Sequence, residues 1–520
     1  MNLLDDPLLR VRTFEGMTRM SLPALLAALG REEVMNLPGI QRHQEDAFHV
    51  FLCCLAATIL ARRGDEDPVQ DEAYWRSGLL MLAEGDEDAW RLVVDDPARP
   101  AFMQPPLPQA DHARLKPAAS TPDALDLLPT AKNHDLKQSR AAHPQLDEWI
   151  YALVSLQTMS GYYGRGNPGI SRMNGGFGNR SIVELVHRHT PGGRWQDAVI
   201  RLQAHRANVL QGEWGYDPEG LALVWLEPWD GRQMLELSRL DPFYVEICRR
   251  VRLRGEENTI IHAESVPSEK NRIAAEKLKG VVGDAWLPVD LSDDKAGVKA
   301  LTVSPQGLTP DLLRRLVFED DLELTVLQRP LPGRKGPVWL SVSVLVRGQG
   351  TTDGFRERRI LIPAEVRPRL FGPRERRDPL ARLSRTGIEY AGKMQSQVLK
   401  PAIFAFIEGA PEKLQFDRDS AAAWWLRCQR RFDALWSGDY FPWLWDVPDP
   451  DQPEAALNQW VKRLCDHALT VLREAEQAMP QHDGRHYRSL VRAENTFFGA
   501  LFRTFQQLKE ENTRATGTHD

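Results

Sequence analysis

The four long amphipathic segments that follow Arg377 limit what this chain can fold into more than any other feature of its sequence. Apolar residues recur at helical spacing in each segment, and proline or glycine separates one segment from the next. Helices of about twenty residues with one apolar face bury that face most readily against one another. The segments, residues 388–409, 419–438, 453–479 and 487–511, therefore predict a helical bundle.

The chain before Arg377 carries a mixture of strand and helix patterns. Alternating β-branched residues at 338–346 and 358–366 predict an antiparallel hairpin whose long tip reads RGQGTTDGFRE. The fold class is thus predicted as α+β, with a large mixed N-terminal domain with antiparallel β-hairpins over 1–372 and a C-terminal four-helix bundle over 378–513. Further strands are expected at 8–14, 221–228, 297–305 and 322–330, and helices at 21–30, 45–64, 146–159, 181–190 and 194–210.

Composition excludes several classes of protein. At 520 residues the chain is long enough for two or three domains of roughly 100–200 residues. It contains no apolar run near the roughly 20 residues of a membrane span, and its N-terminus lacks the pattern of a secretory signal, so a cytoplasmic location is expected. Its five cysteines are scattered without CxxC spacing, which argues against a disulfide framework and against a zinc site. The adjacent Cys53 and Cys54 lie in an apolar helical pattern that predicts core packing.

A glycine-rich run, GYYGRGNPGISRMNGGFG, spans residues 161–178. It holds seven glycines and no acidic residue, and Arg165, Arg172 and Arg180 lie in or beside it. Glycine lets a backbone approach a bulky surface, arginine binds phosphates and base edges, and Tyr162 and Tyr163 offer rings for stacking. An ordinary exposed loop would explain the run equally well, but a second basic loop near Gly350 favours a nucleic-acid surface.

Charge is distributed unevenly along the chain. The net charge is −6, yet residues 329–377 hold twelve Lys/Arg against four Asp/Glu, a local +8 that leaves −14 on the remainder. An acidic body with focused basic loops suits selective contact with a duplex rather than general coating of DNA.

Motifs of enzymatic chemistry are absent. The sequence contains no GxxxxGK[ST], HExxH or GxSxG, and its His–Asp dipeptides at 134–135, 482–483 and 519–520 have no supporting metal-ligand pattern. The sequence Cys465-Asp466-His467 lies in a predicted helix, where adjacent residues point apart. Five tryptophans between Trp424 and Trp445 fit either a packed core or an exposed patch for a protein partner.

Six motifs in order resemble one family, the large subunit of the type I-E CRISPR Cascade complex, called CasA. They are MNLLDDPLLRVR at the N-terminus, PAFMQPP (100–106), KNHD (132–135), the glycine-rich run, GDAWLPVD (283–290) and RGQGTTDGFRERR (347–359). The resemblance extends over essentially the whole chain and includes the order of a mixed domain followed by a four-helix bundle.

The resemblance implies a subunit that is not an enzyme and needs no cofactor or metal. Members of the family recognise the protospacer-adjacent motif in double-stranded target DNA, wedge the strands apart to begin R-loop formation and recruit a helicase-nuclease. The implied partners are therefore target DNA, the guide-RNA ribonucleoprotein with its other subunits, and the helicase-nuclease, with no membrane. The cysteine-rich insertion of some members is absent here, so no zinc is expected.

Carried over residue by residue, the family's wedge corresponds to Gln349, Gly350, Thr351 and Thr352, with Gly350 and Thr351 nearest the first opened base pair. Its glycine loop maps onto Gly161, Gly164, Arg165 and Gly166, whose backbone would approach the minor groove. Its lysine finger falls on Lys295 or, as second choice, Lys299. The segment near the guide's 5′ end matches Lys132, Asn133 and His134, and Arg347 and Arg358 flank the wedge as candidate phosphate contacts.

Some members carry amide-rich wedge tips, whereas this chain has Gly-Thr-Thr. Since the minor groove mainly distinguishes A·T from G·C, the preferred motif does not follow from these residues. Two other classes of function stay open from the residues alone. One is a metal-dependent nuclease or hydrolase that uses residues such as His134 and Asp135, and the other is a purely structural assembly scaffold.

Overall fold

Two units make up the chain in the computed structural model. The structure describes residues 1–126, 144–174, 179–256, 259–292, 295, 297–304, 306–318, 321–348, 351–408, 419–479 and 483–506, excluding the side chains of 347–353, 419–420 and 483. The N-terminal unit comprises Met1–Leu308 and residues 319–361, and the C-terminal unit comprises Thr309–Phe318 and residues 362–520. Residues 309–318 thus group with the C-terminal unit, although they precede the hairpin in the sequence.

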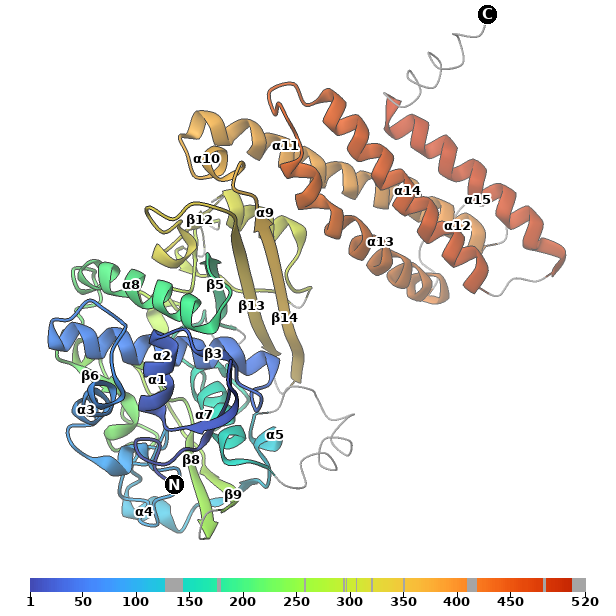
Figure 1. Cartoon of the computed structure of the whole chain (residues 1–520). Coiled ribbons are helices and arrows are strands. Elements are labelled where there is room, and N and C mark those ends of the chain that lie inside the picture. The colour runs from blue at the N-terminus through green and yellow to red at the C-terminus, as the bar shows by residue number, and fades with distance from the viewer. Residues whose placement is uncertain are drawn as a thin grey trace, which may run out of the picture. The chain divides into compact units, whose positions relative to one another are not determined.

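Helix α2 (Arg42–Arg63) is the central helix of the N-terminal unit (Figure 1). Its apolar side chains, Cys53 and Cys54 among them, are buried, and Gly64 ends the helix with a φ of 72°. Its length and hydropathy would suffice for a membrane span, but 78% of that apolar stretch is buried inside the unit. Around it stand α1 (Leu22–Gly30), α3 (Glu72–Leu82), α4 (Gln109–His112), α5 (Pro122–Leu125), α7 (Leu146–Met159) and α8 (Pro191–Leu210).

The strands of this unit form small sheets, antiparallel except for the β6–β7 pair. In the part of the chain that is described, the sheet orders are β2-β1-β3, β11-β10-β12, β14-β13-β5, β4-β9-β8 and β6-β7. Their bounds are β1 (Leu9–Thr13), β2 (Gly16–Met20), β3 (Val34–Asn36), β4 (Lys116–Ala119), β5 (Ser181–Val186), β6 (Leu221–Leu223), β7 (Leu240–Val245), β8 (Arg250–Glu256), β9 (Thr259–Val266), β10 (Val289–Asp290), β11 (Lys299–Ala300), β12 (Leu322–Glu323), β13 (Val338–Gly348) and β14 (Thr351–Ile362).

The helix predicted over 181–190 is wrong, because Ser181–Val186 is strand β5. All six of its residues are buried, and it pairs with β13 from Val186 opposite Trp339 to Ser181 opposite Val344. A short apolar run that is buried on both faces lacks the alternation of apolar and polar residues that identifies a strand. The spacing of its apolar residues therefore could not distinguish a strand from a helix.

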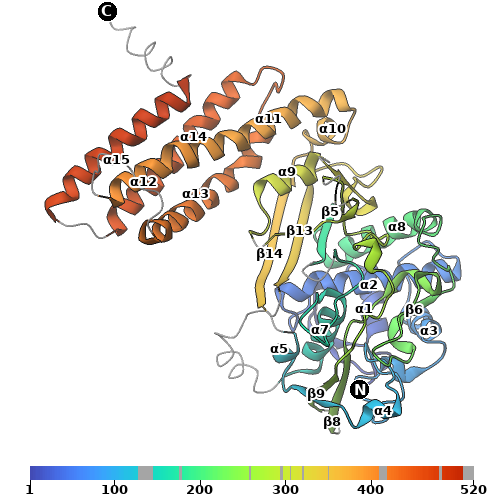
Figure 2. The same ribbon diagram turned by 180° about the vertical axis from the view of Figure 1, so that it is seen from behind.

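The predicted long hairpin tip is also shorter in the structure. Strand β13 continues to Gly348 and β14 begins at Thr351, so Thr351 and Thr352 are strand residues rather than loop residues. Both views of the ribbon show the hairpin as the longest pair of strands in the N-terminal unit (Figures 1 and 2).

The C-terminal unit contains the predicted helical bundle. Helix α11 (Arg374–Lys393) continues through a π-helical turn (Met394–Leu399) into α12 (Lys400–Ile407) as one rod. The other long helices are α13 (Asp419–Trp445), α14 (Glu454–Ala478) and α15 (Asp483–Thr504), and the short helices are α9 (Pro310–Phe318) and α10 (Arg367–Leu370). The mixed α+β architecture with a C-terminal helical region agrees with the predicted fold class.

The tryptophans of the bundle belong largely to its core. Trp443 stacks on Trp460 with ring centroids 4.6 Å apart, and Trp436 lies edge-on to Trp460 at 6.5 Å. Trp424 and Trp425 are half-buried, beside Arg427 and Lys400 respectively. The packed-core interpretation therefore holds for Trp436 and Trp443.

Candidate nucleic-acid interface

The first half of the glycine-rich run folds into a closed loop. The Tyr163 N–H donates to the Asn167 carbonyl and the Asn167 N–H donates to the Gly164 carbonyl, each at 3.0 Å. Gly164 and Gly166 have φ angles of 91° and 90°, which glycine adopts without strain. A Cβ at Gly166 would lie 2.8 Å from the Pro267 Cβ, so glycine is required there for space as well.

Only part of the predicted 161–166 surface is exposed. Arg165 is exposed and Tyr163 is 40% exposed, so a cation and an aromatic ring do stand at the surface. Gly161 is buried instead, and its carbonyl accepts a hydrogen bond from Arg249 at 2.9 Å. The surface that this loop can offer to a duplex is therefore its outer turn, residues 162–166.

Two of the three arginines assigned to this run on sequence grounds are buried structural groups. Arg180 pairs with Asp284 at 2.7 Å, and Arg172 pairs with Glu246 at 2.9 Å and lies 3.9 Å above the Tyr244 ring. Burial raises the pKa of Asp284, but the charges of Arg180 and Arg172 outweigh it and hold that pKa below its ordinary value. These two guanidinium groups hold the loop in place and are not available to bind phosphate.

The end of the glycine-rich run is bonded to the segment that carries the predicted lysines. The Asn179 side chain donates to the Val303 carbonyl at 3.0 Å and accepts from the Val303 N–H at 3.2 Å. A Cβ added at Gly280 would lie 2.7 Å from the Ala300 Cβ and 2.8 Å from the Met173 carbonyl carbon, so these backbones are close. The segment after β11 is therefore joined to the glycine-rich run.

The lysines differ in their surroundings. Lys295 is exposed in the connection between the antiparallel strands β10 and β11. Lys299 is half-buried in β11, where it pairs in register with Asp290. Lys295 is thus the more accessible of the two, and its assignment as the lysine finger stays a prediction.

The hairpin projects from the same end of its sheet at which the glycine-rich run enters. The chain passes from Asn179 directly into β5, whose first residue, Ser181, pairs with Val344 of β13. Strand β13 then extends four residues past this pair to Gly348. The residue that follows the glycine-rich run, the segment after β11 and the part of β13 before its projecting end therefore lie beside one another in the N-terminal unit.

The two faces of strand β14 carry different charges. Glu357 and Arg359 lie on one face and pair with each other at 3.2 Å. Arg356 and Arg358 lie on the opposite face, and both are exposed. Arg358 therefore keeps its predicted availability for phosphate, and Arg356 adds a second cation beside it.

Several predicted residues lie outside the part of the chain that the structure describes. These are Lys132, Asn133, His134, Gln349 and Gly350, together with the side chains of Arg347, Thr351 and Thr352. The described chain nevertheless approaches the outer loop before residue 127, because Leu125 of α5 lines a cavity of about 220 Å³ with Gly161, Tyr163 and Asn167.

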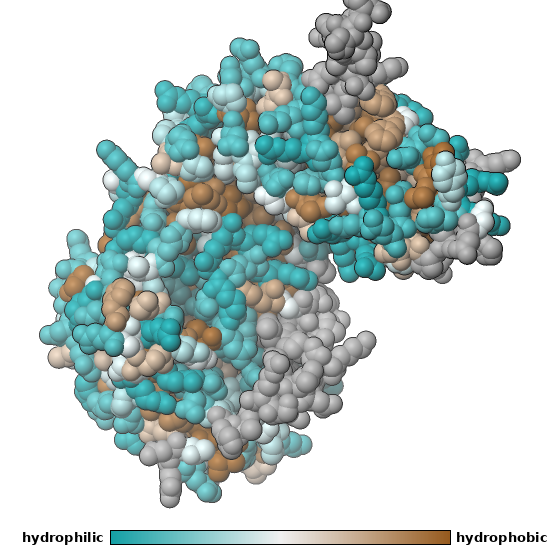
Figure 3. Space-filling view, turned by 45° about the vertical axis from the view of Figure 1, so that its right-hand side comes forward, coloured by the Kyte–Doolittle hydropathy of each residue, from teal (hydrophilic) through white to brown (hydrophobic). Residues whose placement is uncertain are grey.

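The basic residues of 329–377 are divided between the two units. Arg334 pairs with buried Asp197 at 3.2 Å, while Arg367, Arg369, Arg374, Arg376 and Arg377 belong to the C-terminal unit. Arg369 donates to the Val447 carbonyl at 3.2 Å and so ties a loop of that unit. On the face shown in Figure 3, hydrophilic residues cover most of the surface and hydrophobic residues form smaller patches.

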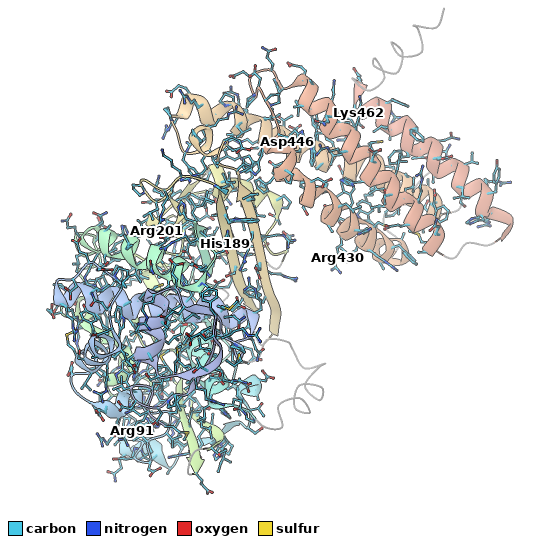
Figure 4. All side chains as sticks on the ribbon, in the orientation of Figure 1. Arg91, His189, Arg201, Arg430, Asp446 and Lys462 are labelled. Atoms are coloured by element: carbon cyan, nitrogen blue, oxygen red, sulfur yellow. The ribbon has the colours of Figure 1, made fainter. Side chains whose placement is uncertain are left out.

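Sequence reasoning missed a buried polar network behind the hairpin. Glu184 of β5 bonds to Arg194 at 3.0 Å and to Arg201 at 3.2 Å, and His49 of α2 lies 3.5 Å from it. Figure 4 places Arg201 on α8. The signal available in the sequence was Glu184 as the single charge in the run SIVELV.

Within the described ranges, no group of three or more His, Cys, Asp or Glu side chains is placed to hold a metal ion. Burial raises the pKa of Cys54 to about 12, which disfavours the thiolate that nucleophilic or metal chemistry requires. His467 lies 2.8 Å from Asp439 of the neighbouring helix, so its contact is with another helix and not with Cys465.

No protein-family model and no curated protein sequence matches this chain. Solved structures do match over nearly its whole length. CasA (Cse1) of Thermus thermophilus has a TM-score of 0.63 and 16% identity, covering 97% of this chain and 99% of that one. Cse1 of Thermobifida fusca has a TM-score of 0.60 and 16% identity, covering 97% and 98%. Cse1 of Acidimicrobium ferrooxidans, described as a CRISPR-associated protein, has a TM-score of 0.59 and 14% identity, covering 98% of both chains.

The chain therefore has the fold of these CasA (Cse1) structures. This likeness confirms the resemblance inferred from the six sequence motifs. Since the coverage is nearly complete in both directions, it includes the mixed N-terminal unit and the bundle together.

Proposed function

We propose that this chain is the non-catalytic large subunit of a type I-E CRISPR RNA-guided complex in the cytoplasm. In this role it recognises the protospacer-adjacent motif in double-stranded DNA, wedges the strands apart beside it and recruits the helicase-nuclease. Its partners are the target duplex, the guide-RNA ribonucleoprotein and the helicase-nuclease.

The observation that carries the proposal is that the end of the glycine-rich run lies beside both the segment after β11 and strand β13 of the hairpin. These elements lie far apart in the sequence and are joined by the Asn179–Val303 and Ser181–Val344 contacts. The backbone at Gly164 and Gly166 can approach a minor groove closely, and an exposed lysine can meet phosphate or base acceptors there.

The energetics of strand exchange are consistent with such a division of labour. Pairing between guide and target supplies sequence discrimination in a nearly balanced exchange of one duplex for another. The protein therefore needs only to read a short motif and to start the opening. A rigid two-stranded element can do the second task if it enters between the strands, as wedges do in other minor-groove proteins.

The test reconstitutes the full chain with the guide-RNA ribonucleoprotein of its own operon. Thr351→Glu and Thr352→Glu together should leave assembly intact, because these residues lie at the projecting end of the hairpin. Binding of motif-containing duplex should fall by about 100-fold or more, since two new anions would face the phosphates.

Thr18→Glu is the matched control, because Thr18 is an exposed strand residue elsewhere in the same unit. Unchanged duplex binding by the Thr351/Thr352 variant would contradict the proposal and favour an assembly scaffold. Metal-dependent cleavage by the isolated chain that is lost in His134→Ala would favour a nuclease.

A further inference from the structure

Both strands of the β13–β14 hairpin are bonded to the first turns of helix α2. Arg42, the first residue of α2, donates from Nε to Glu357 Oε2 of β14 at 2.7 Å and makes a second bond to the other carboxylate oxygen. Ser343 of β13 donates to Asp46 of α2. The Glu357 pKa is held below its ordinary value by the Arg42 hydrogen bond, so the carboxylate is charged at neutral pH.

The α2 side of these contacts is fixed by the buried polar network. Asp46 pairs with Arg194 of α8 at 2.9 Å, and Arg194 also pairs with Glu184 of β5 at 3.0 Å. Burial raises the pKa of Asp46, but the charge of Arg194 outweighs it and lowers that pKa below the ordinary value. The charges therefore balance in pairs, and α2, α8 and β5 form a rigid support beside the hairpin.

Apolar packing between this support and the hairpin is incomplete. A cavity of about 350 Å³ lies there, lined by Arg42, His49 and Arg194 on one side and by Trp339, Ser341 and Arg359 of the hairpin on the other. His189, labelled in Figure 4 beside the hairpin strands, also lines it and packs edge-on against Trp339 at 5.5 Å. Arg42, which bonds to Glu357 of the hairpin, thus also lines a cavity that side-chain packing does not fill.

The Arg42–Glu357 ion pair contributes little to the stability of the fold. The Arg42 and Glu357 side chains are 43% and 26% exposed, and ion pairs of this kind contribute about 0–1 kcal/mol to stability. Strand β14 is an edge strand, bonded to β13 alone in its sheet. Glu357 is therefore a point at which the outer strand is held against movement away from α2.

We propose that Arg42 and Glu357 are positioning residues that brace the hairpin against α2 while its tip opens the first base pair. This inference rests on the proposed function. Separating a stacked base-pair step costs about 1–2 kcal/mol, so a hairpin that bends away relieves the load without opening the duplex. A hairpin held by Arg42 and Glu357 cannot bend away, so the base pair separates instead.

The experiment compares two targets in the fully reconstituted complex with guide RNA. One target is fully paired, and the other carries the same motif beside base pairs already opened by mismatches. Arg42→Gln and Glu357→Gln should each weaken binding of the paired target by up to about fivefold, the most that an ion pair of this exposure can contribute. Binding of the pre-opened target should change less than about twofold.

The pair is identified by the double variant and by a control. Arg42→Gln with Glu357→Gln together should weaken binding by about the same factor as either change alone, because both remove one interaction. Glu45→Gln removes the other partner of Arg42, within α2, and should leave both targets bound as before.

Equal losses on the two targets, or no loss on either, would overturn the brace. If the unaltered complex does not bind the paired motif target more tightly than a target without the motif, the proposed function itself fails. The two failures are therefore distinguishable. Thermal melting of each isolated variant should stay within about 2 °C of the unaltered chain, as the exposure of the pair implies.

Discussion

The side chain of Asn179 bonds to both backbone groups of Val303. It donates to the carbonyl at 3.0 Å and accepts from the N–H at 3.2 Å. This single side chain joins the end of the glycine-rich run to the segment that follows β11. It is buried, so its hydrogen bonds are not exchanged for bonds to water. This amide thus helps to fix the relative position of the two segments.

Asn179→Ala should therefore destabilise the chain and weaken binding of motif DNA together. Two buried backbone groups of Val303 would lose their partners, at a cost of about 2–4 kcal/mol. Urea unfolding measures the first effect, and duplex binding by the reconstituted complex measures the second. Asn208→Ala, at an exposed position on α8, should change neither quantity; an Asn179 variant as stable as the unaltered chain would contradict this role.

Gly164 and Gly166 offer a matched pair for testing the glycine loop. Their φ angles are nearly equal, but a Cβ at Gly164 meets open space, whereas one at Gly166 would lie 2.8 Å from the Pro267 Cβ. Gly164→Ala should cost about 1 kcal/mol of unfolding free energy from backbone strain alone, and Gly166→Ala about 2–3 kcal/mol because the clash adds to it. Equal costs by chemical denaturation would show that Pro267 does not confine the loop.

Arg165 and Arg180 should have opposite effects. Arg165→Ala removes an exposed cation, so stability should not change, while the slope of log affinity against log salt should fall by about 1. Arg180→Ala removes one of the two arginines that pair with buried Asp284, so it should cost about 3–5 kcal/mol of stability. Salt titrations of duplex binding and urea unfolding separate the two; a change in salt slope caused only by Arg180 would reverse the assignment.

The C-terminal unit should become less stable as the pH rises toward neutrality. Burial and the neighbouring Glu494 raise the pKa of Glu476 to about 7. A carboxyl group with a raised pKa binds its proton more tightly in the folded state, so its contribution to stability is present at low pH. That contribution decreases between about pH 4.5 and pH 7.

Glu476→Gln should therefore raise the melting temperature by about 1–3 °C at pH 8 and change it little at pH 5. Glu474→Gln is the control of opposite sign, because the Arg431 hydrogen bond lowers the pKa of Glu474. A Glu476 variant with an unaltered pH profile of melting would contradict the raised pKa.

The sequence predicted most reliably those elements whose signal is local. Helix α7 occupies 146–159 as expected, because a long apolar pattern fixes a helix without reference to the remainder of the fold. Strand β5 was predicted as helix, since its state depends on pairing with β13 more than 150 residues away. Short β11 and β12 were predicted as longer strands, because the apolar alternation continues beyond the two residues of each that pair with β10.

The glycine-rich run and the hairpin were recognisable in the sequence, but the partners of their charged residues were not. Arg165 and Arg180 look alike in the sequence, and only the fold reveals that Asp284 lies beside the second. Nothing in the sequence indicated that Arg42 contacts the hairpin, because its partner Glu357 follows it by 315 residues. Ion pairs between distant segments have no period, and the sequence therefore does not disclose them.

The pairing of Ser181–Val186 with residues 339–344 also sets the order in which this molecule can mature on the ribosome. Helices α1 to α8 can form while the chain is still being made, but β5 finds its neighbour only after the codons for β13 have been translated. Until then the unpaired backbone edge of this mainly apolar strand is exposed to other nascent chains. A pause or truncation between these codons would therefore release an aggregation-prone fragment rather than a smaller working protein.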